Sequence, residues 1–336
     1  MVNNAKSESL RKMIDNNEAL IVLVLFILFN IIVTPNFLSM GTLNNLIIQM
    51  TPSLLTGLGM TWVIASGGID ISVGSVMALS SIVSAKALVP TAAAANAQVG
   101  GWGWCLPAIP SMLVGIIAGM LSGLLVGLII AKFRIQPIIV TLTFMISIRG
   151  IAQIINDSML LEFKDESYTF IGKARLFNVI PIQLLIMAIA VVIIWYVSNK
   201  MVFGRYVQAV GDNFKASFLT GINTSVVIVA IYVTSAFLAS IAGIVKTAEL
   251  AAADANGIGK LIELDAIAAV AIGGTPMTGG KPSVTGTVFG VIIIALVDIS
   301  VNMNNIPYAY AQVIKAAIII VALWSRSLIK KRQGVR

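Results

Sequence analysis

Long apolar stretches without charged residues are the feature of this sequence that most restricts its fold. From Leu43 to Ala65 there is no Asp, Glu, Lys or Arg, and a hydrophobic run resumes from Ile71 through Ala85. About 20 apolar residues in a helix are needed to cross the core of a bilayer. Only 11% of the residues are charged, whereas a soluble domain has about 25% charged residues. The sequence therefore predicts an all-α polytopic membrane protein.

We predict about ten transmembrane helices, several of them short or broken. The first eighteen residues are too polar, and the run after them lacks a small-residue cleavage site, so we expect no removable signal peptide. The expected organisation is a cytoplasmic segment at 1–18, a transmembrane domain at 19–325 and a basic cytoplasmic tail at 326–336. Within the domain, 156–179 forms an external loop and 199–222 a cytoplasmic one. The predicted spans lie near 19–34, 43–66, 70–89, 107–131, 137–155, 180–198, 223–246, 264–281, 284–303 and 309–325.

The positions of the basic residues account for the net charge of +8. With the amino terminus in the cytoplasm, 14 of the 22 Lys and Arg residues fall in cytoplasmic segments and four in external loops. The other four, Lys86, Arg149, Lys246 and Lys315, lie near or within spans. Cytoplasmic loops of membrane proteins carry an excess of Lys and Arg. We therefore expect both termini in the cytoplasm, with membrane lipid and not nucleic acid in contact with the chain.

The residue content excludes several kinds of catalysis. There is no histidine, which rules out Ser-His and Cys-His nucleophiles. The single cysteine, Cys105, cannot form an internal disulfide, and no metal-ligand cluster is present. Gly280-Lys281 resembles the end of a phosphate loop, but Thr275 and Pro282 stand where that motif needs a glycine and a hydroxyl. We predict no metal, cofactor or ATP site and no enzymatic activity in this chain.

Between two apolar runs, the segment Ser66–Ser75 breaks the helix and introduces a carboxylate. Two glycines end one helix and release the backbone. Asp70 is then expected to cap a helix beginning at Ile71. An ionisable residue beside membrane spans indicates function, but a simple cap at a water-exposed turn is an equally good interpretation. The candidates for a substrate pathway or signature turn are Gly67, Gly68, Asp70, Ser72, Gly74 and Ser75.

In the cytoplasmic segment 204–222, Asp212 or Asn213 can cap a short helix that Gly221 ends. Phe214, Phe218 and Ile222 follow at four-residue spacing, so one face of this helix is aromatic and apolar. Such a helix could dock on a soluble partner. The alternative is that it rests in the lipid interface.

Residues 263–283 have an apolar core too short to span a membrane, and it runs into glycines and prolines. This pattern predicts a short or broken helix beside a cavity. The stretch from Thr278 aligns without gaps on the stretch from Ser66, a weak sign of repeated construction. A glycine at every fourth position from 115 to 127 forms a stripe that predicts close helix packing. The candidates in the broken-helix loop are Glu263, Asp265, Gly273, Gly274, Gly279 and Gly280.

From about Asn36 onward, these stretches together resemble the permease subunit of the monosaccharide-importing ATP-binding cassette family, which includes ribose, galactose and xylose permeases. The matching motifs are GMTWVIASGGIDISVGSVMALS at 59–80, FGRYVQAVGDNFKASFLTGIN at 203–223 and ELDAIAAVAIGGTPMTGGKPSVTGT at 263–287. The residues that fall in the family's ATPase-coupling segment are Arg205, Gly211, Asp212, Asn213, Phe214, Ala216, Phe218 and Gly221.

This resemblance implies a type II importer-like permease bundle in the bacterial inner membrane. It implies a second permease subunit, identical or paralogous, and a cytoplasmic ATPase that binds the ATP and Mg. It further implies a periplasmic or lipid-anchored sugar-binding protein, to which the family's sugar selectivity is attributed. The sequence therefore leaves open which sugar is carried.

Two other function classes compete with the importer. An ion-coupled secondary transporter could use Asp70, Asp265 and Asp298 as ion carriers. An intramembrane aspartyl protease would need two facing aspartates, and no GxGD signature is present. For a neutral sugar, the polar candidates along a pathway are Asp70, Ser72, Ser75, Asn302 and Asn304.

Overall fold

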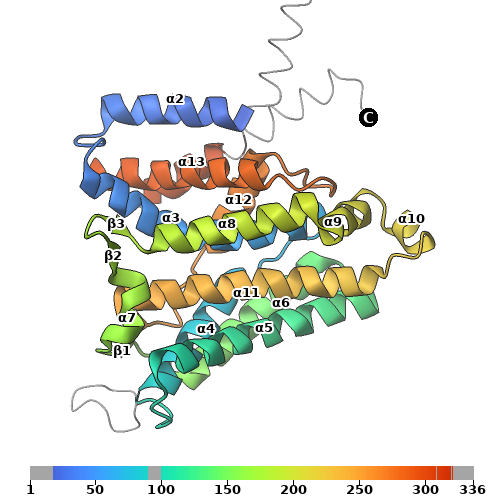
Figure 1. Cartoon of the computed structure of the whole chain (residues 1–336), viewed down its shortest axis with the longest axis horizontal. Coiled ribbons are helices and arrows are strands. Elements are labelled where there is room, and N and C mark those ends of the chain that lie inside the picture. Colours follow the sequence, from blue (N-terminus) through green and yellow to red (C-terminus); the bar gives the residue numbers. More distant parts are fainter. Residues whose placement is uncertain (1–17, 90–99, 308, 319, 321–336) are drawn as a thin grey trace, which may run out of the picture.

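The computed structural model describes residues 18–89, 100–307, 309–318 and 320. The fold is an all-helical bundle, with α7 and the short strands at one end and α9 and α10 at the other (Figure 1). We refer to these as the α7 end and the α10 end. The first elements are α2 (Glu18–Val33), α3 (Met40–Ala65), α4 (Val73–Leu88), α5 (Ala108–Phe133), α6 (Pro137–Ile155), β1 (Leu161–Glu162) and α7 (Glu166–Lys173). They are followed by β2 (Arg175–Leu176), β3 (Ile180–Pro181), α8 (Gln183–Lys200), α9 (Val202–Asp212), α10 (Phe214–Leu219), α11 (Thr224–Leu250), β4 (Ala252–Ala253), α12 (Ile262–Gly273) and α13 (Val284–Met303).

Most predicted spans are confirmed as helices. Among the described residues, six helices are long and apolar enough to cross a membrane. They are α3, α5, α6, α8, α11 and α13; α2 and α4 are shorter apolar helices. The predicted last span is helical over 309–318. Most of the predicted segment 1–18, the basic tail 326–336 and the end of the last span lie outside the described residues.

Two predicted spans are shorter than expected. The span expected at 70–89 begins only at Val73, and the one expected at 264–281 is the 12-residue helix α12. At 1.5 Å per residue, α12 rises about 18 Å, which is too short to cross a bilayer. The expected broken helix is therefore present, and α4 is a second short element.

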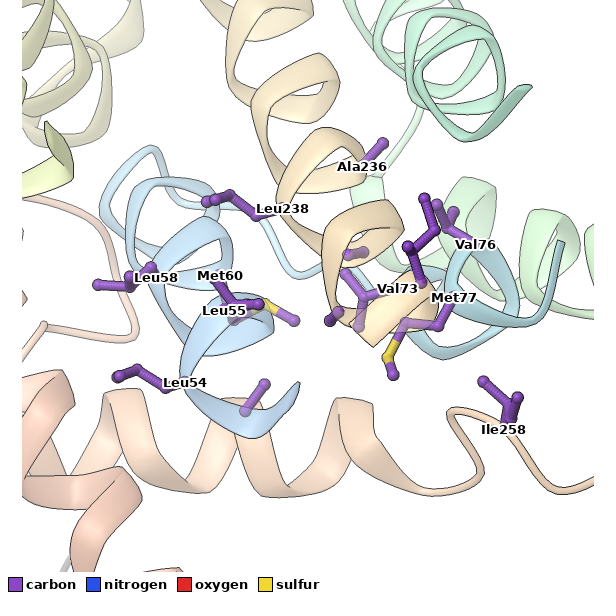
Figure 2. Packing of buried hydrophobic residues seen from close by; sticks show 14 of the residues in the cluster. Leu54, Leu55, Leu58, Met60, Val73, Val76, Met77, Ala236, Leu238 and Ile258 are labelled. Atoms are coloured by element: carbon purple, nitrogen blue, oxygen red, sulfur yellow. The ribbon is translucent and has the colours of Figure 1, made fainter. Parts of the chain in front are cut away.

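At the centre of the bundle lies α4, in which all 16 residues are buried. It packs against α5, α6 and α11, and α11 also contacts α3 and α7. Figure 2 shows α11 between α3 and α4, with Leu238 toward α3 and Ala236 on the side that faces α5. Met77 on α4 lies near Ile258, which belongs to the segment between α11 and α12 (Figure 2). The core is thus organised around α11.

The glycine stripe of α5 packs as predicted. A Cβ at Gly123 would overlap Ala236 of α11, and one at Gly115 would lie 2.8 Å from the Cβ of Ser84 on α4. Side chains larger than hydrogen would push these helices apart. The stripe therefore sets the distance of α5 from both neighbours.

The predicted external loop 156–179 contains folded structure. Its strand β1 pairs with β4, and β2 pairs with β3. On α7, the buried Tyr168 shares a 2.6 Å hydrogen bond with the hydroxyl of Ser84, and burial raises the pKa of Tyr168 above its usual value. This segment therefore covers the ends of α4 and α11.

Candidate functional site

The chain turns back on itself between α3 and α4. After Ala65 the backbone reverses at Gly67, whose φ of +84° favours glycine. Gly68 then fits against α11, because a Cβ there would lie 2.6 Å from the hydroxyl oxygen of Tyr232. The segment 68–72 thereby runs back into the bundle before α4 begins.

Asp70 lies inside the bundle and does not cap a helix at Ile71. Its Oδ1 accepts hydrogen bonds from the backbone N–H of Ser72 at 3.0 Å and from that residue's hydroxyl at 2.6 Å. Its Oδ2 accepts from the hydroxyl of Ser235 at 2.9 Å. Ser235 is the twelfth residue of the 27-residue α11, so it lies near the middle of the bundle. The predicted cap at Ile71 and the alternative of a water-exposed turn are both wrong.

The starts of α4 and α12 meet within the bundle. Gly74 packs so closely on Gly259 that a Cβ would overlap the carbonyl oxygen of Gly259. The same Cβ would lie 2.7 Å from a carboxylate oxygen of Glu263. Ser75 donates to the carbonyl oxygen of Met145 on α6 at 2.7 Å. Two discontinuous helices therefore begin side by side, a construction found at transporter pathways.

Arg149 of α6 stabilises the loop that leads into α12. Its guanidinium donates to the carbonyl oxygens of Ala255 at 2.7 Å and Ile258 at 3.1 Å. Ala255 and Ile258 are buried residues of the irregular segment between α11 and α12, and their carbonyl oxygens need a donor there. Sequence reasoning gave Arg149 no role, although a single charge within an apolar span is a signal for one.

Behind α12, an ion triad joins three helices. The ammonium of Lys315 lies 3.0 Å from a carboxylate oxygen of Asp265 and 2.8 Å from one of Asp298. Asp265, which was predicted as a candidate in the broken-helix loop, is therefore an ion-pair partner of Lys315. The sequence placed Asp265 and Asp298 as separate candidates and left Lys315 without a role.

At the α10 end, the three motif stretches converge. The N–H of Gly280 donates to the carbonyl oxygen of Ala65 at 2.8 Å. Gly211 of α9 fits between them, since a Cβ there would overlap Ala65 and lie 2.8 Å from the nitrogen of Gly280. Gly279 lies against the carbonyl of Gly211 and has a φ of +92°. The structure thus brings together the glycines predicted on separate motifs.

The predicted short helix is α10, and Asn213 is its cap. The Asn213 side chain accepts from the N–H of Ala216 at 2.9 Å, while Asp212 ends α9. Phe218 is 58% exposed, whereas Phe214 is 36% exposed and has the guanidinium of Arg134 5.7 Å from its ring centroid, so the aromatic face is only partly covered. Gly221, with a φ of +87°, leads the backbone into α11. Arg205 is exposed on α9.

An indole connects this region to the core. Trp62 on α3 donates to the hydroxyl of Ser198 on α8 at 2.7 Å and packs edge-on against Phe203 of α9, with ring centroids 5.1 Å apart. A displacement of α9 therefore acts directly on α3. Sequence reasoning missed Trp62, Tyr232 and Ser235, because their partners are distant in sequence. Among the described residues, no cluster of three His, Cys, Asp or Glu side chains could hold a metal.

Comparison with known proteins gives full-length similarity. Residues 42–323 match the family described as branched-chain amino acid transport system / permease component. The galactofuranose transporter permease protein of Escherichia coli K12 is 32% identical, covering 94% of this chain and 92% of its own. The ribose import permease protein of Bacillus subtilis 168 is 36% identical over 89% of both chains. That of Haemophilus influenzae is 32% identical over 96% of both. No solved structure gives a significant match.

Proposed function

The chain belongs to the branched-chain amino acid transport system / permease component family, and from this premise we propose that it is the permease subunit of an ATP-binding cassette importer for a monosaccharide. The observation that carries the proposal is the similarity over nearly the whole chain to sugar permeases. The family description names amino acids, but these relatives are named for galactofuranose and ribose. The relatives therefore favour a sugar as the cargo.

The orientation we propose places the α10 end in the cytoplasm of a bacterium. The loops at the α7 end mix acidic with basic residues, whereas the α10 end is mainly basic. Such an excess of positive charge is typical of cytoplasmic loops. The basic residues at the α10 end are Lys132, Arg134, Lys200, Arg205, Lys215 and Lys281.

In this proposal the energy comes from a cytoplasmic ATPase that binds ATP and Mg and docks on α10. The exposed rings of Phe214 and Phe218 provide an apolar contact. From α10, movement passes to α9 and then to α3 through Trp62, and Gly211 carries it to the turn at Gly280. Rigid elements in contact shift together in this way. The chain itself then supplies no catalysis and no cofactor site.

The other partners belong at the remaining faces. We assign a periplasmic or lipid-anchored sugar-binding protein to the α7 end, where residues 156–179 form a folded surface that exposes both charged residues and large apolar side chains such as Phe170 and Phe177. A second permease subunit, the same chain or a paralogue, would enclose the pathway. An ion-coupled transporter is disfavoured, because Asp265 and Asp298 share the ammonium of Lys315 and Asp70 is saturated with hydrogen bonds.

The test is uptake into proteoliposomes that contain the chain with the ATPase and binding protein encoded beside it. We expect ATP-dependent accumulation of one sugar from a panel of D-ribose, D-allose, D-fructose and D-galactofuranose, and none of L-leucine. Accumulation should persist when ionophores collapse the ion gradients. Uptake driven by an ion gradient without ATP, or uptake of leucine alone, would reject the proposal.

Docking on α10 is tested by the double variant Phe214→Ala/Phe218→Ala. We expect the ATPase to be lost on purification, because both aromatic anchors are gone. The matched control is Phe170→Ala, which removes a ring of similar exposure on α7. If the double variant retains the ATPase and sugar-stimulated hydrolysis as the control does, the docking site lies elsewhere.

A further inference from the structure

A polar cavity of about 480 Å³ lies in the half of the bundle toward the α7 end. Residues of α3, α11, α13 and the loop before α12 form its walls. At its outer end are Lys246 and Leu250, near the end of α11. At its inner end are Met77 of α4 and Gly259, and Gly259 packs directly on Gly74. The cavity thus leads from the α7 end to the place where the two discontinuous helices begin, and its size is typical of small-molecule sites.

Several polar groups in the cavity have no hydrogen-bond partner among the described residues. They are the side-chain amides of Gln49 and Asn302 and the hydroxyl of Ser53. In addition, Asp298 Oδ1 is a buried acceptor that has no donor among the described residues. Gln49 and Asn302 are exposed and Ser53 is half-buried, so their side chains are accessible to a molecule in the cavity. These groups together offer both donors and acceptors to a molecule in the cavity.

Most of the charges around the cavity are already compensated. Asp265 and Asp298 share Lys315, and Lys246 pairs with Glu249 at 2.9 Å. Two further lining residues, Asp254 and Lys260, form no ion pair among the described residues, so the cavity offers charged groups as well as uncharged amides and a hydroxyl. A sugar hydroxyl both donates and accepts, so a neutral polyol matches such a set.

We infer that this cavity is a sugar-binding site in the outer half of the translocation pathway, with Gln49 and Asn302 contacting the sugar hydroxyls. The inference rests on the proposed function and gives its substrate a location. It moves substrate contact away from Asp70, whose two oxygens are occupied by Ser72 and Ser235 and whose exposure is 3%. The turn at 66–75 then positions α3 and α4, and the cavity binds the sugar.

The experiment measures uptake by the complete complex carrying Gln49→Leu or Asn302→Leu, with each sugar of the panel. We expect each variant to lower uptake about tenfold, since it removes a hydrogen-bonding amide from the pathway. The matched control is Asn45→Leu, an exposed amide one turn along α3 that does not line the cavity, and it should transport normally. The wild-type complex and the three variant complexes should assemble in equal amounts. The separate binding protein, which is unchanged, should have the same affinity for sugar in each assay.

A second readout separates binding from folding. In a Cys105→Ser chain, Gln49→Cys and Asn302→Cys should react with a membrane-impermeant methanethiosulfonate reagent added to the α7 side. Millimolar transported sugar should slow the reaction.

The outcomes separate the two proposals. If the wild-type complex accumulates leucine and no sugar, or takes up solute on an ion gradient without ATP, the proposed function is wrong, and this inference falls with it. If the wild type transports but the leucine variants match Asn45→Leu, or the thiols are unreactive or unprotected, the cavity is not the sugar site.

Discussion

Asp70 illustrates how much one side chain holds together at the residue scale. Three donors reach its two oxygens, two from Ser72 and one from Ser235 on α11. The carboxylate therefore ties the segment before α4 to the centre of α11. Two properties, hydrogen-bond acceptance and negative charge, could account for its presence, and substitution separates them.

We expect Asp70→Asn to keep most of the stability and transport, because its amide oxygen accepts from Ser72 while the Ser235 hydroxyl turns to accept from the NH₂ group. Asp70→Ala leaves these donors unpaired, at a cost of about 1–3 kcal/mol. The melting temperature of the purified protein and sugar uptake are the measurements. If Asp70→Asn lowers the melting temperature and uptake as much as Asp70→Ala does, the negative charge itself is required. If Asp70→Ala equals wild type in both, Asp70 is needed for neither stability nor transport.

The contact of Gly74 with Gly259 is a second residue-scale constraint. We predict that Gly74→Ala destabilises the protein by about 1–3 kcal/mol, because its Cβ overlaps the carbonyl oxygen of Gly259 on rigid backbone. Gly150→Ala on α6 is the control, since nothing lies within 4 Å of the added methyl group. Equal melting temperatures for the two variants would mean that the two helix starts can separate freely.

At the scale of elements, the Lys315 triad joins α12, α13 and the helix at 309–318. We expect Lys315→Met to destabilise by about 3 kcal/mol, because two carboxylates lose their counter-ion. Adding Asp265→Asn and Asp298→Asn should restore most of the melting temperature. If the single variant is as stable as wild type, the triad does not hold α12 in place.

Local sequence patterns predicted the helices well and their three-dimensional relations poorly. Apolar length located α5, α6 and α13, and the glycines at 273–280 indicated that α12 is short. The same local rules misplaced the start of α4, because Asp70 followed by an apolar run is typical of a cap. Its actual partner, Ser235, is 165 residues away. The helix α9 was not predicted, nor were the two-residue strands, which carry too little pattern to detect.

The functional signals had the same limits. Asn213 and the aromatic face of α10 were predicted because capping and four-residue spacing are local. The meeting of Ala65, Gly211 and Gly280 was not predicted, because nothing local indicates that three turns share one point. The cavity around Gln49 is likewise formed by residues from distant parts of the chain.

For the whole molecule, the proposed orientation makes a prediction about the native cysteine. Cys105 is exposed just before α5, which begins at the end opposite α10 (Figure 1), so it should react with an impermeant thiol reagent in intact spheroplasts. In a Cys105→Ser chain, Met201→Cys at the α10 end should react only after the membrane is permeabilised. The opposite labelling pattern would mean that the orientation in the membrane is reversed and that the basic α10 end lies outside.

The complete burial of α4 also has a consequence for how the protein is made. With 16 residues it is shorter than a normal span, and it includes Ser80, Ser81, Ser84 and the buried Lys86. One of its partners, α11, emerges from the ribosome more than a hundred residues later, after α5 and α6. Until then, no α11 is available to cover these polar groups. We therefore expect the hydrogen bonds that join Ser80 and Ser81 to Ser240 and Thr247 of α11 to form only after the second half has been synthesised.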